Sequence, residues 1–217
     1  MQSKKASFLF FSLILFISFI LFSYLVERGV FSSYDFAATA SLQNRLPATL
    51  DLPFSILTLF GSMEITGLVW LSIAAASFLK KDFPALFALS LFWVGLALEF
   101  IGKIFLFHPA PPNFFFRGQG IIFPSGYVHT NYSYPSGHIY RTTFLVTFFI
   151  LTLYLSRKSL SRLALIWLLA VFLGLMFVSR IYLGEHWTTD VVGGLLLGAS
   201  LGIIPALFFR QNSRPAV

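Results

Sequence analysis

The chain has 217 residues, of which 57% are hydrophobic and only 11% charged, and its mean hydropathy is +0.83. A soluble domain carries roughly 25% charged residues, so this composition excludes an ordinary soluble protein and indicates an integral membrane protein. The net charge of +7 could suggest nucleic-acid binding, but no basic face or nucleic-acid motif accompanies it. The absence of cysteine excludes disulfides and cysteine metal sites.

Six apolar runs are long enough to cross a bilayer, which takes roughly 20 mostly apolar residues as a helix. They cover about residues 7–26, 54–79, 84–107, 139–156, 160–179 and 188–209. The first run lacks a small-residue cleavage pattern, so we interpret it as a retained span and not as a signal peptide. Backbone in lipid must satisfy its own hydrogen bonds, and the runs lack the alternation of a β-barrel. The sequence therefore predicts an all-α, polytopic membrane protein with six transmembrane helices in a single domain, 1–217.

The connecting segments predict the orientation. Basic residues on one side lie in the termini and very short loops, and they are Lys4, Lys5, Lys80, Lys81, Arg157, Lys158, Arg162, Arg210 and Arg214. The positive-inside rule then places both termini in the cytoplasm and the loops 27–53, 108–138 and 180–187 outside. All four histidines, His108, His129, His138 and His186, fall on that outer side. The segment 27–53 fits a short interfacial helix or an ordinary connector equally well, and the long loop 108–134 is typical of a functional loop or lid.

The first polar motif is Pro135-Ser136-Gly137-His138, at the start of the fourth run. Proline ends the loop, Ser136 can cap the following helix, and backbone N–H groups near Gly137 can face an anion at the helix N-terminus. His138 could protonate a leaving oxygen. The simpler interpretation is a helix cap alone. A second Pro-Ser-Gly at 124–126 is not followed by histidine, and we interpret it as a turn.

The second motif comprises Ser179, Arg180, His186 and Asp190, between the fifth and sixth runs. His186 and Asp190 are four residues apart and share a helix face. A carboxylate on one imidazole nitrogen fixes the tautomer and leaves the other nitrogen as a nucleophile. Arg180 could hold two phosphate oxygens at once. A polar helix end with a surface histidine is the alternative, which the three residues at this spacing make less favourable.

Lys103, late in the third run, is a further candidate. Glu99 lies four residues earlier, so an ion pair within the helix is one interpretation. Neutralisation of a phosphate is the other, and spacing alone favours neither.

These motifs resemble the type 2 phosphatidic acid phosphatase (PAP2) superfamily, the membrane lipid-phosphate phosphatases, and the resemblance covers most of the chain. It implies that His186 attacks phosphorus, Asp190 orients His186, and His138 protonates the leaving group. It assigns phosphate binding to Lys103, Ser136, the Gly137 amide and Arg180. It also implies a lipid phosphate or diphosphate substrate at the outer interface, with no metal and no other cofactor. The sequence itself gives no sign of a nucleic-acid partner or of an obligate protein partner.

One family element departs from the pattern. An arginine is expected seven residues after Lys103, but Ala110 stands there. A replacement positive charge could come from His108, Arg117 or Arg141. Loss of one charged contact costs about 1.5–3 kcal/mol, which slows a reaction roughly tenfold to a hundredfold.

This departure leaves a second function open, a lipid-phosphate-binding or transport protein with weakened catalysis. The related vanadate-dependent haloperoxidases are soluble, so the six predicted spans argue against that activity. The compact loops and the lack of a eukaryotic sorting signal favour a bacterial cell membrane.

Overall fold

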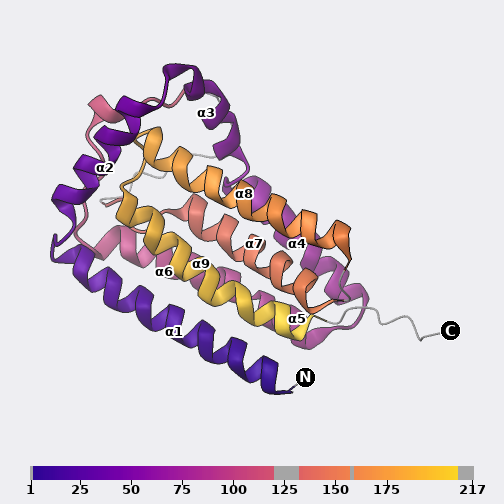
Figure 1. Cartoon of the computed structure of the whole chain (residues 1–217). Coiled ribbons are helices and arrows are strands. Elements are labelled where there is room, and N and C mark those ends of the chain that lie inside the picture. Colours follow the sequence, from indigo (N-terminus) through magenta and orange to yellow (C-terminus); the bar gives the residue numbers. More distant parts are fainter. Residues whose placement is uncertain (1, 120–131, 157–158, 210–217) are drawn as a thin grey trace.

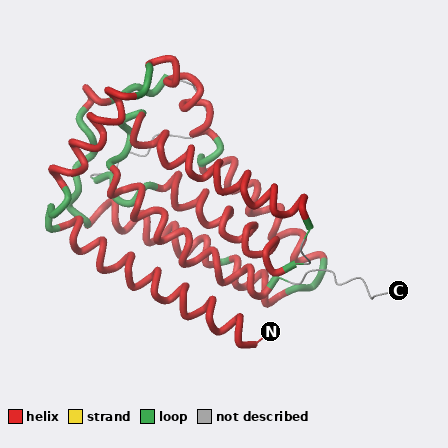
Figure 2. The backbone as a smooth tube through the Cα atoms, viewed as in Figure 1, coloured by secondary structure: helices red, strands yellow, loops and turns green. Residues whose placement is uncertain are grey.

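The protein is a bundle of helices in a computed structural model that describes residues 2–119, 132–156 and 159–209. Within these ranges every regular element is helical (Figure 2). The elements are α1 (Gln2–Glu27), α2 (Ser32–Arg45), the 3-10 turn η1 (Ala48–Leu50), α3 (Asp51–Leu59), α4 (Met63–Leu79), α5 (Phe83–Leu89), α6 (Leu91–Phe105), the 3-10 turn η2 (Asn113–Phe115), α7 (Gly137–Leu155), α8 (Leu160–Tyr182) and α9 (Thr188–Phe208). The all-α prediction is confirmed.

Six stretches are long and apolar enough to span a membrane, as the sequence predicts. They are Lys4–Glu27, Ala48–Leu79, Phe83–Phe105, Gly137–Leu155, Leu160–Tyr182 and Thr188–Phe208. Two of them are not single helices, because the second breaks between α3 and α4 and the third between α5 and α6. At the first break the Ser62 hydroxyl caps α4 by accepting from the Ile65 N–H, and the Gly61 carbonyl accepts from the Arg141 side chain. Side-chain bonds thus satisfy groups that an unbroken helix would use internally.

The centre of the bundle is the pair α7 and α9, which the other spans surround (Figure 1). Gly194, Gly198 and Gly202 recur every four residues on α9 and face the backbone of α7. A Cβ atom on Gly198 would lie 2.5 Å from the Tyr140 carbonyl oxygen, and one on Gly202 equally close to that of Phe144. Small residues in this pattern let two membrane helices approach closely. The first turns of both helices are therefore held side by side.

The two ends of the bundle differ. α1 begins and α9 ends at one end, whereas α2, η1 and α3 lie at the other (Figure 1). The segment 27–53 contains α2, so a helix is present there, as one of the two interpretations expects. Its polar residues Asp35, Thr39 and Gln43 are buried at four-residue spacing. Gln43 donates to the carbonyls of Phe115 and Tyr182, which fixes α2 against η2 and the end of α8.

Candidate active site

The two predicted motifs meet where α7 and α9 begin. The Ser136 N–H donates to the Asp190 carbonyl at 3.0 Å, which joins one motif directly to the other. Ser136 occupies the N-cap position of α7, but its side chain makes no capping bond. The Ser136 hydroxyl is fully buried and finds no hydrogen-bond partner among the described residues. A buried hydroxyl without a partner is costly, so this oxygen is suited to a ligand.

His186 and Asp190 form a buried pair. His186 Nδ1 lies 3.1 Å from Asp190 Oδ2, and the same oxygen accepts from the Trp187 N–H at 3.0 Å. Burial lowers the pKa of His186 well below its usual range, and the positive charges of Arg180, Lys103 and Arg141 lower it further. The imidazole is therefore neutral at pH 7. A neutral imidazole whose Nδ1 is bonded to a carboxylate keeps Nε2 as its basic, nucleophilic nitrogen.

Arg180 is buried at the end of α8, within ion-pair distance of the Glu185 carboxylate. Its carbonyl accepts from the N–H groups of Glu185 and His186, both at 3.3 Å, and so shapes the turn to α9. Gly184 in this turn has φ +67°, and a Cβ atom there would collide with the Phe115 backbone. Only glycine fits both conditions without strain. Glu185 is a polar residue of the site that the motif reasoning did not include.

Lys103 and Arg141 share one carboxylate. Lys103 Nζ lies 2.7 Å from Glu99 Oε1, and Arg141 Nη1 lies 3.2 Å from Glu99 Oε2. The intrahelical pair that the spacing allows is therefore present. Two cations face one anion, so the cluster keeps a net positive charge. The same two cations act on both His138 and His186, so neither interpretation of Lys103 excludes the other.

Arg141 also lies against the first motif. A Cβ atom on Gly137 would lie 2.8 Å from Arg141 Nη1 and would collide with Glu99. His138 is the next residue, and its ring packs against Gly61, to whose carbonyl the Arg141 guanidinium donates. The start of α7, the break before α4 and the cations of α6 and α7 thus lie together, and both cations lower the pKa of His186.

The structure distinguishes the three candidate substitutes for the missing arginine. Arg141 lies at the start of α7, as described. Arg117 instead donates to the Tyr182 hydroxyl at 3.2 Å, beside Asp51 of α3. His108 lies behind Asp190, with its Nε2 3.3 Å from Asp190 Oδ1, and burial lowers its pKa to about 4. A neutral imidazole cannot replace the charge of an arginine. The fourth histidine, His129, and the second Pro-Ser-Gly, 124–126, lie outside the described residues.

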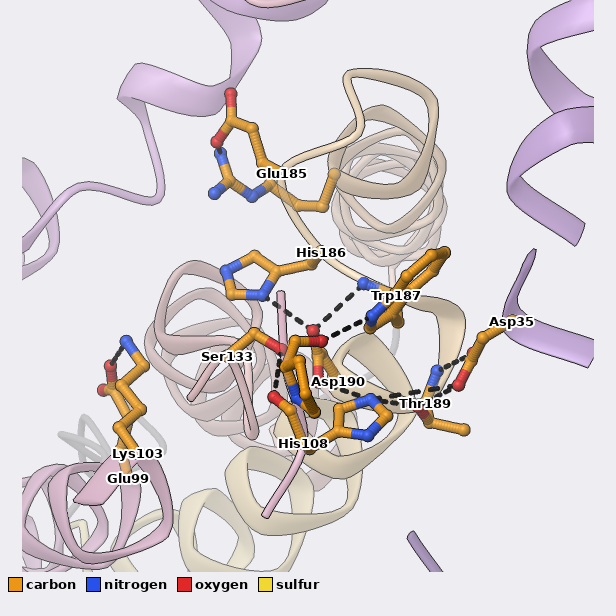
Figure 3. Close-up of polar contacts among 12 residues, drawn as sticks. Asp35, Glu99, Lys103, His108, Ser133, Glu185, His186, Trp187, Thr189 and Asp190 are labelled. Carbon is orange, nitrogen blue, oxygen red and sulfur yellow. Dashed lines mark hydrogen bonds and ion pairs between the residues drawn. The ribbon is translucent and has the colours of Figure 1, made fainter. Parts of the chain in front are cut away.

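Two residues near Asp190, Asp35 and Thr189, are not part of the predicted motifs. Asp35 of α2 accepts from Thr189 twice, at Oδ1 from the N–H (2.9 Å) and at Oδ2 from the hydroxyl (2.6 Å). Burial raises the pKa of Asp35. Figure 3 shows His186 and His108 on opposite sides of Asp190, with Asp35 beyond Thr189. The signal for Asp35 was the polar spacing of 35, 39 and 43, which marks one buried face of α2.

Chemically, the site combines a neutral imidazole, three neighbouring cations and a buried hydroxyl. Such an arrangement can bind an oxyanion and attack it with a nitrogen nucleophile. Within the described ranges, no group of three or more His, Cys, Asp or Glu side chains is arranged to hold a metal ion.

Comparisons with known proteins agree with the fold and with the family resemblance. A family model described as "PAP2 superfamily" matches residues 83–214, which include both motifs and Lys103. A crystal structure of a transmembrane PAP2-type phosphatidylglycerolphosphate phosphatase from Bacillus subtilis is similar at a TM-score of 0.69 and 22% identity, over 89% of this chain and 93% of that one. The crystal structure of LpxE from Aquifex aeolicus is similar at a TM-score of 0.53 and 22% identity, over 78% of this chain and 93% of that one. Among curated proteins, none matches the sequence significantly.

Proposed function

Because this chain belongs to the PAP2 superfamily, we propose that it is a membrane phosphatase that hydrolyses a lipid phosphate or diphosphate. One observation carries the proposal. The neutral His186 imidazole, bonded to Asp190, lies within the electrostatic reach of Arg180, Lys103 and Arg141. Cations that surround a nucleophile stabilise the charge that a phosphoryl group carries in the transition state.

We place the reacting atoms as follows. His186 Nε2 attacks phosphorus, the bond between phosphorus and the leaving oxygen breaks, and a phosphohistidine forms. His138 gives its proton to the leaving lipid alkoxide or, for a diphosphate, to the leaving phosphate. Asp190 accepts the Nδ1–H of His186 and stabilises the positive charge on the ring. Water then attacks phosphorus, the bond between phosphorus and His186 Nε2 breaks, a proton of the water passes to His138, and inorganic phosphate leaves.

Phosphate binding in this proposal falls to groups on three helices, α6, α7 and α8. The contributors are Lys103, the Ser136 hydroxyl, the Gly137 amide, Arg141 and Arg180. The assignment of Arg141 is supported by its guanidinium beside Gly137, and it supplies the charge that Ala110 lacks. A buried guanidinium can donate bidentately to phosphate oxygens, as the motif arginine would.

The position of the site supports the proposed class of substrate, a lipid phosphate. The site is at the end of a bundle whose outer walls are apolar, so a head group can enter it while the hydrocarbon tails stay in the bilayer. Undecaprenyl diphosphate, phosphatidic acid, phosphatidylglycerol phosphate and diacylglycerol diphosphate all fit this description. We propose that the site faces away from the cytoplasm and that the membrane is a bacterial cell membrane.

The second candidate function is a lipid-phosphate-binding or transport protein with weakened catalysis. Two observations favour it. Ala110 provides no charge, and Glu185 pairs with Arg180 at the position where phosphate would bind.

A phosphate-release assay separates the two functions. The purified protein in nanodiscs is given each of the four lipid phosphates, with His186→Ala as the matched inactive variant. We expect release from at least one lipid by the wild type and background release by the variant. Release at the variant's level from every lipid, together with retained lipid binding, would favour the binding protein instead.

A further inference from the structure

A second layer of polar residues lies behind the His186–Asp190 pair. Asp190 is completely buried, and its two carboxylate oxygens face different partners. Oδ2 takes His186 Nδ1, whereas Oδ1 lies 3.3 Å from Nε2 of His108. His108 Nε2 is also 3.1 Å from the Thr189 hydroxyl and 3.9 Å from Asp35 Oδ2. Figure 3 shows this row of side chains extending from His186 to Asp35.

The backbone around His108 is held in place from two sides. Its carbonyl accepts both from the Ser133 N–H at 3.0 Å and from the Ser133 hydroxyl at 3.1 Å. The next carbonyl, of Pro109, accepts from the Trp187 indole at 2.8 Å. The His108 ring packs edge-on against Tyr134. The imidazole is thus fixed relative to both motifs, and its side chain is 8% exposed.

The hydrogen positions follow from the partners. Thr189 donates its hydroxyl proton to Asp35 Oδ2, so its oxygen accepts from His108. Asp190 Oδ1 is also an acceptor when the carboxylate is ionised. The proton of a neutral His108 therefore sits on Nε2, which donates it to the Thr189 oxygen, and Asp190 Oδ1 lies 3.3 Å from the same nitrogen. A donor on the ionised carboxylate favours that charged form.

We propose that His108 is a positioning residue for Asp190, and that Thr189 and Asp35 in turn hold His108 in its donating tautomer. In this arrangement His108 fixes the rotamer of Asp190, so that Oδ2 points at His186 Nδ1. The inference deepens the proposed function and rests on it. It also gives His108 a role distinct from phosphate binding, which its sequence position alone had suggested.

The test compares two substitutions at one position. His108→Phe keeps an aromatic ring against Tyr134 but removes the donor, whereas His108→Gln keeps an N–H. His108→Phe removes the polar N–H beside the Asp190 carboxylate, and we expect kcat to fall about tenfold to a hundredfold. We expect KM to stay within about twofold of the wild type and His108→Gln to recover most of kcat. Thr189→Val, which removes only the hydroxyl, should lower kcat several-fold.

A second readout does not depend on turnover. NMR of protein labelled with ¹⁵N in histidine reports which ring nitrogen carries the proton, and His186→Gln identifies the His186 signals. We expect His186 to be protonated on Nδ1 in the wild type and in His108→Gln, and to become a mixture of tautomers in His108→Phe. An unchanged His186 tautomer in a folded His108→Phe would overturn the proposal. So would a rise in KM at constant kcat, because that result assigns His108 to phosphate binding.

The proposed phosphatase activity and the role of His108 can be disproved independently. If the wild type releases phosphate from no lipid, the proposed function is wrong. The NMR comparison would still decide whether His108 orients the His186–Asp190 pair.

Discussion

At the scale of single residues, each of the three cations near His186 contacts a carboxylate. Glu99 lies between Lys103 and Arg141, and Glu185 pairs with Arg180. These acids hold long basic side chains in place before an anion binds. Each acid also competes with that anion, and Glu185 does so most directly because it engages the guanidinium of the second motif.

The first prediction concerns Glu185. We expect Glu185→Gln to bind inorganic phosphate several-fold more tightly than the wild type, because Arg180 is released from a charged partner; an ion pair contributes about 1 kcal/mol or somewhat more when partly buried. The measurement is the inhibition constant of phosphate in the release assay. Glu27→Gln, at the exposed end of α1, serves as a control of equal charge change. Weaker phosphate binding by Glu185→Gln would show instead that Glu185 positions Arg180 for the substrate.

The second prediction concerns the protonation of His186. Burial and three cations hold its pKa well below 6.5, so the ring is protonated only in acid. Below that pKa the imidazolium has no lone pair for attack, and as the pH rises through it the nucleophile forms. We expect an NMR titration of His186 to show a midpoint well below pH 6.5, and the catalytic rate to show no loss from His186 protonation across the neutral range. A midpoint at or above 6.5 would contradict the electrostatic description of the site.

The sequence predicts the residues of the two motifs better than it predicts their surroundings. The motif spacings are local, and the structure brings Ser136 and Asp190 together through one backbone bond. The place of His108 depends on contacts across the chain, since Asp35 and Thr189 are 154 residues apart. Spacing along the chain carries no information about such contacts, so it could not separate His108 from Arg141 as a source of charge.

At the scale of helices, the site depends on how closely α7 and α9 approach. Both motifs lie in or beside the first turns of these helices, and Gly194, Gly198 and Gly202 follow in the next turns of α9. A small residue at each contact lets the backbones meet, and any side chain there would force the helices apart. The glycine spacing is visible in the sequence, but the partner helix that it faces is not.

The third prediction tests this contact. We expect Gly198→Ala to destabilise the protein by about 1–3 kcal/mol, because its Cβ atom would overlap the Tyr140 carbonyl and Thr143. The measurement is the Tm in detergent, followed by phosphate release at a temperature where the variant is folded. Gly174→Ala on α8 is the matched control, since a Cβ atom there meets nothing within 4 Å. Its Tm should stay equal or rise slightly, because alanine favours a helix. Equal Tm values for both variants and the wild type would show that α7 and α9 can accommodate a methyl group at this contact.

At the scale of the whole molecule, hydropathy predicts the six spans but not their interruptions. A hydropathy window of about 20 residues averages over the turn at Gly61 and Ser62. This turn is stabilised by Arg141 of α7, which donates to the Gly61 carbonyl. The window likewise passes over Ser90, between α5 and α6. The placement of α2 against η2 and over the N-terminus of α9 follows from the buried bonds of Asp35 and Gln43, which composition does not reveal.

The final prediction concerns which end of the bundle faces the cytoplasm. The chain has no cysteine, so a single introduced cysteine reports its own accessibility without background. Ser33 is exposed on α2 at the site end, and Ser161 is exposed in the first turn of α8, which starts at the opposite end. The clustering of Lys and Arg near Ser161 predicts that its end is cytoplasmic. A membrane-impermeant maleimide should therefore label Ser33→Cys in intact cells and Ser161→Cys only after permeabilisation. The reverse pattern would place the site in the cytoplasm, where it would act on head groups of the inner leaflet.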